Sequence, residues 1–269
     1  MPQVRKKLIR QALLPSILAL SIAVSLACEL EEGAAKNQPS VPGRLSVKVL
    51  AEYPHDSGAF TQGLLWHDGS LYESTGNYGR SSVREVRLET GDVINQVNLH
   101  QRFFAEGLAR VRGRLFQLTW REGVALVYDL PRLRESDRLN YSGEGWGLSY
   151  DGTWLVMSDG SDVLSFRDPK NMAVWKRLPV TLRGKPVKLL NELECAQGAI
   201  FANVWQETDI MRIAPDTGKV TAVIDASILL TRMKWPPRNV MNGIAYASER
   251  GTFFLTGKYW PKVFEVRFE

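Results

Sequence analysis

A fivefold internal repeat constrains this chain of 269 residues more than any other feature. Each repeat has a short apolar strand, a glycine-containing turn and a second strand. The turn glycines are Gly69, Gly113, Gly152, Gly198 and Gly251. They are spaced 44, 39, 46 and 53 residues apart, a period that fits one four-stranded sheet per repeat. The sequence therefore predicts a ring or array of similar small sheets.

The segments between these strand pairs complete the pattern. A strand with alternating apolar residues and a turn rich in Asp, Gly or Pro follows each of the first four pairs, for example residues 83–88 before 89–92. The last repeat ends one strand short, and residues 45–50 can supply the missing strand. We therefore predict an all-β, five-bladed β-propeller closed by the N-terminal strand, which pairs in the last blade. The only helix-like segment after the leader is a turn near residues 226–232.

Residues 1–27 have the order of an export signal. Four basic residues (Arg5, Lys6, Lys7, Arg10) precede an apolar run over 12–27, which is shorter than the about 20 residues of a membrane-spanning helix. The run ends in Ser25-Leu26-Ala27-Cys28, which resembles a bacterial lipoprotein box. We expect residues 1–27 to be a signal peptide and Cys28 to be the lipidated first mature residue. The alternative is an ordinary cleaved signal, and the mass of the mature N-terminus distinguishes the two.

The basic character of the chain belongs to this leader. The net charge of +5 falls to +1 without residues 1–27, because 30 basic and 29 acidic residues remain. A nearly neutral body argues against a nucleic-acid partner. We expect residues 28–44 to be a flexible tether and residues 45–269 to be the propeller. The expected location is the cell envelope, on the periplasmic or outer-membrane side, with a monomer that contacts the membrane only through the lipid.

Two repeat positions should form rings around the propeller axis. One ring would contain Gln62, Glu106, Trp146, Glu192 and Asn242. The other would contain Gly76, Trp120, Asp159, Trp205 and Lys258. A purely structural ring would repeat one small or apolar residue, whereas these rings combine acids, amides, indoles and one amine. Apolar walls with a few convergent polar groups are typical of a small-ligand site.

Several of these motifs also occur, in order, in a known family. Phe60-Thr61-Gln62-Gly63-Leu64, Phe104-Ala105-Glu106-Gly107-Leu108, Leu190-Asn191-Glu192, Asn203-Val204-Trp205 and Asn242-Gly243-Ile244 resemble the plant-type glutaminyl-peptide cyclotransferase (glutamine cyclotransferase) family, which has bacterial members. The resemblance covers about residues 45–269. It implies a five-bladed propeller that converts the N-terminal Gln of peptides and proteins to pyroglutamate, with release of ammonia and without a metal or other cofactor.

The resemblance also implies roles for individual residues. Glu106 would carry the proton from the amine to the leaving nitrogen, and Lys258 would stabilise the oxyanion. Gln62, Asn191 and Asn242 would be polar substrate-binding residues. The aromatic cage would consist of Phe60, Phe104, Trp120, Trp146 and Trp205. At the fourth repeat the alternatives stay open, because the repeat alignment favours Glu192 and the resemblance favours Asn191.

Two other classes of function compete with this interpretation. A non-catalytic, lipid-tethered propeller could bind peptides or cell-wall material, but it would not need an acid at position 106 inside an indole cage. A metal-dependent lactonase-type propeller could draw on Glu106, Asn191, Glu192 and Asn242. The three histidines (His55, His67, His100) lack metal-ligand spacing, which argues against zinc. Cys195 is expected to be a core thiol.

Overall fold

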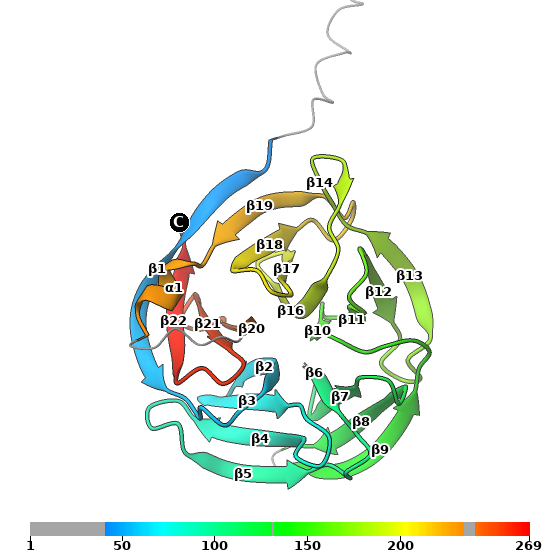
Figure 1. Cartoon of the computed structure of the whole chain (residues 1–269). Helices are drawn as coiled ribbons and strands as arrows, with labels where there is room; N and C mark the ends of the chain where they lie inside the picture. Colours follow the sequence, from blue (N-terminus) through cyan, green and yellow to red (C-terminus); the bar gives the residue numbers. More distant parts are fainter. Residues whose placement is uncertain (1–40, 131, 234–239) are drawn as a thin grey trace, which may run out of the picture. The chain divides into compact units, whose positions relative to one another are not determined.

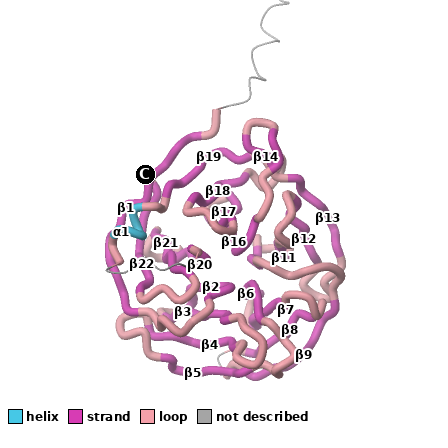
Figure 2. The backbone as a smooth tube through the Cα atoms, viewed as in Figure 1, coloured by secondary structure: helices cyan, strands magenta, loops and turns pink. Residues whose placement is uncertain are grey.

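The computed structural model describes residues 41–130, 132–233 and 240–269 (Figure 1). They belong to the compact unit Ser40–Glu269. The expected signal peptide, the lipidation site Cys28 and most of the expected tether lie outside these residues. Within the described part, regular structure is almost entirely β, and the single helix is the short α1 (Ile228–Thr231; Figure 2). No helix in that part is long and apolar enough to cross a membrane. The all-β prediction is confirmed.

Three antiparallel sheets of four strands follow one another along the chain. Their strands are β2 (Thr61–His67), β3 (Ser70–Thr75), β4 (Ser82–Arg87) and β5 (Val93–Asn98); β6 (Ala105–Val111), β7 (Arg114–Thr119), β8 (Val124–Asp129) and β9 (Arg134–Asn140); and β10 (Leu148–Tyr150), β11 (Leu155–Met157), β12 (Val163–Arg167) and β13 (Val174–Pro179). Figure 1 shows a propeller-like arrangement, in which the first strand of each sheet is innermost and the fourth is outermost. A small hairpin, β14 (Thr181–Leu182) and β15 (Lys185–Pro186), follows the third sheet and was not expected from the repeat.

The remaining strands form one eight-stranded sheet, in the order β16-β17-β18-β19-β1-β22-β21-β20. They are β16 (Leu190–Ala196), β17 (Ala199–Val204), β18 (Asp209–Ile213), β19 (Val220–Asp225), β20 (Met241–Ala247), β21 (Thr252–Gly257), β22 (Lys262–Phe268) and β1 (Gly43–Pro54). Strand β1 is shared. Its first residues pair in parallel with β19, and the stretch from Val47 to Pro54 pairs antiparallel with β22. It starts two residues before the expected position 45.

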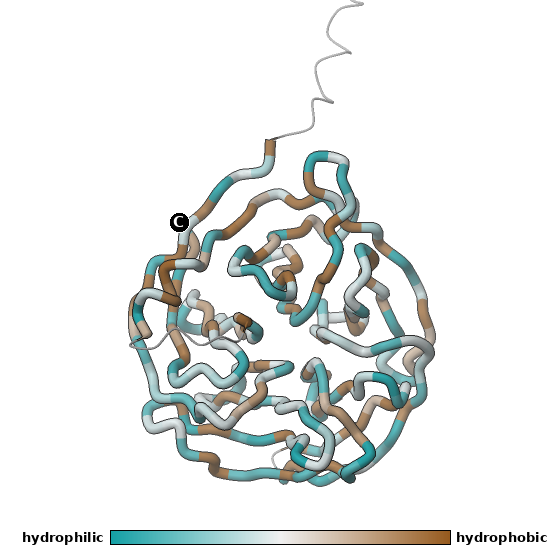
Figure 3. Tube along the Cα trace, in the orientation of Figure 1, coloured by the Kyte–Doolittle hydropathy of each residue, from teal (hydrophilic) through white to brown (hydrophobic). Residues whose placement is uncertain are grey.

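The core lies between successive groups of four strands. The second strands, such as β17 and β21, are buried along their whole length, and Figure 3 shows hydrophobic residues along many of the strands, so the inner part of each sheet has apolar side chains for its neighbours. Buried side chains of the described residues form five hydrophobic clusters, and four of them join two neighbouring sheets. The fifth joins the two halves of the eight-stranded sheet, where Phe201 of β17 packs against Phe253 of β21. Each sheet is therefore stable only beside its neighbours.

The innermost strands approach one another backbone to backbone at glycine. A Cβ atom on Gly63 would lie 2.5 Å from the Leu108 nitrogen, and one on Gly107 would lie 2.3 Å from the Leu148 nitrogen. A Cβ atom on Gly147 would lie only 2.0 Å from the Asn191 carbonyl oxygen. No larger residue fits at these positions without moving a strand, which explains why the repeats carry a Gly-Leu pair.

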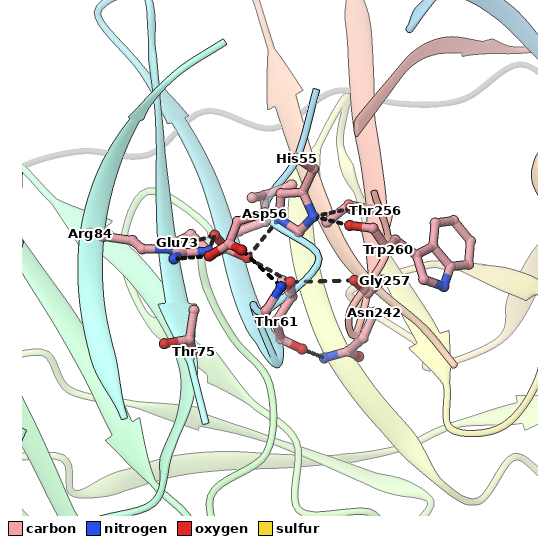
Figure 4. Close-up of polar contacts among 12 residues, drawn as sticks. His55, Asp56, Thr61, Glu73, Thr75, Arg84, Asn242, Thr256, Gly257 and Trp260 are labelled. Atoms are coloured by element: carbon pink, nitrogen blue, oxygen red, sulfur yellow. Dashed lines mark hydrogen bonds and ion pairs between the residues drawn. The ribbon is translucent and has the colours of Figure 1, made fainter. Parts of the chain in front are cut away.

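A buried ionic cluster anchors the end of β1 (Figure 4). The His55 ring lies 3.0 Å from the Glu73 carboxylate through Nε2 and 2.6 Å from the Trp260 carbonyl oxygen through Nδ1. Arg84 donates to the same carboxylate at 2.9 Å and to Asp56 at 2.9 Å. Burial alone would lower the pKa of His55, but the Glu73 carboxylate raises it overall. Burial likewise opposes ionisation of Glu73, yet His55 and Arg84 lower its pKa to about 2. The imidazolium therefore ties β1 to β3 and to the turn after β21.

Removal of β1 tests how far the sheets depend on it. A chain that begins at residue 41 keeps both pairings of β1 and the ionic cluster, and it should melt at the temperature of the longer chain. A chain that begins at residue 56 loses both pairings and leaves Glu73 without His55. Breaking a buried pair costs about 3–5 kcal/mol, so the melting temperature should fall by roughly 10 °C or more. Equal melting temperatures in circular dichroism would show that β1 is not needed.

Candidate active site

The first ring of polar residues lies at β-bulges of the innermost strands. Strand pairing shifts register between Thr61 and Gly63, between Ala105 and Leu108, between Leu190 and Leu193, and between Met241 and Ile244. The residues inside these shifts do not pair with the second strand, as is usual for bulges near functional sites. Equivalent bulge positions are occupied by Gln62, Glu106, Asn191 and Asn242, and Trp146 has the same place before Gly147 and Leu148. The repeat alignment that placed Glu192 in this ring is wrong by one residue.

Glu192 instead occupies the position that is glycine in the other repeats. Its carboxylate accepts hydrogen bonds from the Leu64 nitrogen at 3.2 Å and the Ile244 nitrogen at 2.8 Å. Burial raises its pKa well above the usual range, and the two backbone donors oppose that shift only in part. These contacts connect β16 to β2 and β20. The Glu192 carboxyl is thus engaged by backbone, whereas Oδ1 of the buried Asn191 has no hydrogen-bond partner among the described residues.

The second ring also needs one correction. Four members of this ring share one backbone contact: the N–H groups of Gly76, Trp120, Trp205 and Lys258 each donate to the carbonyl of the residue directly before an inner strand. In the third repeat the equivalent residue is Gly160, one residue after the predicted Asp159. A Cβ atom on Gly160 would lie 2.7 Å from the Trp146 ring, and one on Gly76 would lie 2.5 Å from the Phe104 ring. Two members of this ring are therefore glycines that make room for cage aromatics.

A chain of side-chain hydrogen bonds orients Glu106. Gln62 Nε2 donates to Glu106 Oε1 at 2.8 Å, and Asn242 Nδ2 lies 3.2 Å from Gln62 Oε1. Asn242 Nδ2 also lies 3.1 Å from the carbonyl oxygen of Thr61, whose hydroxyl donates to Glu73 at 2.6 Å (Figure 4). Asn242 thus fixes the amide of Gln62 and connects the site to the ionic cluster at the end of β1.

Glu106 and Lys258 form a buried pair of titratable groups. Burial raises the pKa of Glu106 well above its usual range, Lys258 opposes that shift, and Glu144 and Glu122 add to it. Burial lowers the pKa of Lys258 to about 8, although Glu106 acts in the opposite direction. The Lys258 amine also lies 4.6 Å from the centre of the Phe60 ring. Burial therefore disfavours the charged form of both groups, which raises the pKa of Glu106 and lowers that of Lys258.

An arc of half-buried aromatic rings surrounds these polar groups. Ring centres lie 5.3 Å apart for Tyr259 and Phe60, 6.0 Å for Phe60 and Phe104, 5.6 Å for Phe104 and Trp120, and 5.9 Å for Trp146 and Trp205. Trp205 is the most exposed of them, at 36%. Gln62, Glu106 and Lys258 are buried. The polar groups of the site are therefore more deeply buried than the aromatic rings, which we call the aromatic rim.

Two residues of this rim were not among those predicted from the sequence. Tyr259 follows Lys258 directly, and Glu144 bridges Trp120 and Trp146 by accepting from the two indole nitrogens at 2.8 and 3.1 Å. The repeat did carry a signal for Glu144. It lies four residues before Leu148, as Phe60 and Phe104 lie four residues before Leu64 and Leu108.

Neither a metal-binding cluster nor a reactive thiol accompanies this site in the part of the chain that the structure describes. Among residues 41–130, 132–233 and 240–269, no cluster of three or more His, Cys, Asp or Glu side chains is arranged to hold a metal ion. Cys195 lies in β16 as a free, half-buried cysteine, and burial raises the pKa of its thiol.

Comparison with known proteins gives a consistent result. The family model described as glutamine cyclotransferase matches residues 19–268. A protein of Arabidopsis thaliana named glutaminyl-peptide cyclotransferase is 41% identical over 226 residues, which cover 82% of this chain and 71% of the relative. The crystal structure of Myxococcus xanthus glutaminyl cyclase is similar with a TM-score of 0.80 and 43% identity, over 85% of this chain and 98% of that one.

The family match spans nearly the whole chain, and both relatives exceed 40% identity. The resemblance found in the repeat motifs is thereby confirmed. This chain belongs to the glutamine cyclotransferase family.

Proposed function

We propose that this protein is a glutaminyl-peptide cyclotransferase, which converts the N-terminal Gln of peptides or proteins to pyroglutamate and releases ammonia. The family and the names of both relatives support this activity. The observation that carries it is the buried Glu106 carboxyl, hydrogen-bonded to Gln62 and electrostatically coupled to Lys258, beneath an aromatic rim. A scaffold that only binds peptides has no need to bury an acid and an amine in this way.

The proposed reaction forms one bond and breaks one. The neutral α-amine of the substrate attacks the side-chain amide carbon, and the resulting tetrahedral centre loses its original amide nitrogen as ammonia. Glu106 accepts the proton from the attacking amine and gives it to the leaving nitrogen, so one carboxyl serves both steps. A raised pKa suits this role, because the group must be an acceptor and then a donor at the same pH.

Lys258 is proposed to stabilise the oxyanion that develops on the amide oxygen. An ammonium in a buried site interacts with a developing anion more strongly than it would in water. The aromatic rim would hold the substrate in the folded-back conformation that brings amine and carbonyl together. Asn191 Oδ1, which has no partner among the described residues, is a suitable acceptor for the substrate's amine.

We also propose that the fold is a five-bladed β-propeller. Four of its blades would be β2–β5, β6–β9, β10–β13 and β16–β19. The fifth would consist of β20, β21, β22 and β1, so that the N-terminal strand closes the propeller. Four hydrophobic clusters of the described residues lie between neighbouring sheets, and a fifth lies between the two halves of the eight-stranded sheet, which supports five blades. The pairing of β1 with β22 supports the closure.

Ammonia release from a Gln-initiated dipeptide tests the activity directly. The purified protein should release ammonia from this peptide and none from the same peptide that begins with Asn, whose shorter side chain would close a strained four-membered ring. A chelator should leave the rate unchanged. A rate abolished by the chelator would favour the metal-dependent lactonase-type alternative, and binding without turnover would favour a non-catalytic propeller.

The pKa of Lys258 predicts a distinctive pH dependence. The substrate amine becomes a nucleophile above its pKa of about 7.7–8.0, so kcat/KM should rise through that range. The Lys258 ammonium is lost as pH rises through about 8, so kcat/KM should fall again on the alkaline side. Lys258→Met should lower the maximal rate by a factor of order 10²–10³ and remove the alkaline fall, because residue 258 no longer titrates. An alkaline fall that persists in this variant would assign it to another group.

A further inference from the structure

The aromatic rim is interrupted at one repeat position by a carboxylate. Counting from the leucine of each Gly-Leu pair, Glu144 occupies the position of Phe60 and Phe104. Those two residues contribute rings to the arc, with their centres 6.0 Å apart. Glu144 contributes no ring, and it lies between the two halves of the arc, which end at Trp120 and Trp146.

Glu144 joins those two halves by hydrogen bonds. One carboxylate oxygen, Oε2, accepts from Trp120 Nε1 at 2.8 Å and from Trp146 Nε1 at 3.1 Å. The other oxygen accepts from Arg121 Nε at 3.1 Å, and the Arg121 guanidinium lies 3.7 Å from the centre of the Trp120 ring. The indole hydrogen bonds contribute to a lowered pKa of Glu144, which keeps the carboxyl ionised. Burial acts in the opposite direction.

An indole nitrogen has one donor and no acceptor, so a single oxygen that serves two indoles fixes the rotation of both rings. Each of the two rings also has other packing contacts. Trp120 packs edge to face against Phe104, and Trp146 packs against Trp205 and over Gly160. Glu144 supplies the remaining constraint.

We propose that Glu144 is a positioning residue, which holds the indoles of Trp120 and Trp146 in the orientation in which they bind the substrate. This inference rests on the proposed function, because it assigns the two rings to substrate binding. Glu144 takes no part in proton transfer, and its loss should weaken binding more than turnover.

The chain offers a matched control in Glu122. It is a second half-buried acid, outside the aromatic rim, and like Glu144 it raises the pKa of Glu106. It accepts from the Tyr78 hydroxyl at 2.9 Å and lies 3.5 Å from the Phe104 nitrogen, but it contacts no indole nitrogen of the described residues. Glu144→Ala and Glu122→Ala therefore remove similar charges near Glu106, and only the first releases the two tryptophans.

Steady-state kinetics with a Gln-initiated dipeptide separate the loss of a charge near Glu106 from the loss of the hydrogen bonds to the two indoles. Glu144→Ala should raise KM by about ten- to a hundredfold, the value of one hydrogen bond to a charged group, with kcat changed less than about threefold. Glu144→Gln keeps an oxygen for the indoles and should recover most of the loss. Glu122→Ala should raise KM less than about threefold. The proposal is overturned if Glu144→Gln is as impaired as Glu144→Ala, since charge would then explain the effect, or if the two alanine variants behave alike.

The indole N–H resonances in ¹H–¹⁵N NMR spectra give a readout that does not depend on turnover. The signals of Trp120 and Trp146, assigned with Trp→Phe variants, should both move upfield in Glu144→Ala and stay in place in Glu122→Ala. Unmoved signals in Glu144→Ala would also overturn the proposal. If the wild-type protein releases no ammonia, the proposed function fails, and these resonances alone decide whether Glu144 fixes the rings.

Discussion

The close approach of the innermost strands at glycine is the constraint on which the rest of this structure depends. At Gly63, Gly107 and Gly147 the backbone of the next strand takes the space of a side chain. The inner strands therefore bulge, and the residue before each glycine is released from pairing with the second strand. Gln62, Glu106, Asn191 and Asn242 lie at such bulges in distant parts of the sequence, and Trp146 lies just before the inner strand β10. A rigid scaffold of this kind suits a reaction whose main requirement is one substrate conformation.

Glu192 shows how one position can depart from this constraint. It has the place of the glycine in its repeat, and its carboxylate receives backbone N–H groups of β2 and β20. A buried carboxyl without a cation is costly unless it is hydrogen-bonded, and these donors reduce that cost. The same contacts hold the strands that carry Gln62 and Asn242, so this carboxyl supports the site without belonging to it.

The repeat made much of the fold predictable, because strand length and turn chemistry recur in the sequence. Most ring residues were also predictable, since Gln62, Glu106 and Trp146 each precede a recognisable Gly-Leu pair. The repeat alignment is shifted by one residue at two places. Glu192 took the place of Asn191 because of the bulge between Leu190 and Leu193, and Asp159 took the place of Gly160 because the turn between Tyr150 and Leu155 is longer than those of the first two repeats. The cluster of His55, Glu73 and Arg84 could not be predicted. Glu73 and Arg84 are neighbours on the paired strands β3 and β4, but His55 of the distant β1 region reaches Glu73 only in the assembled fold. Glu144 was missed because a carboxylate at an aromatic position does not look like part of a cage.

Glu106 stands at the centre of the proposed chemistry as the group that transfers the proton, and the residues around it bind the substrate. Glu106→Gln tests this division of roles most directly, because the amide keeps the size of the side chain but cannot accept the proton. With a Gln-initiated dipeptide, kcat should fall by a factor of about 10²–10⁴ while KM changes little. A Glu106→Gln enzyme that keeps a kcat near that of the wild type would contradict this role, since another group would then have to carry the proton.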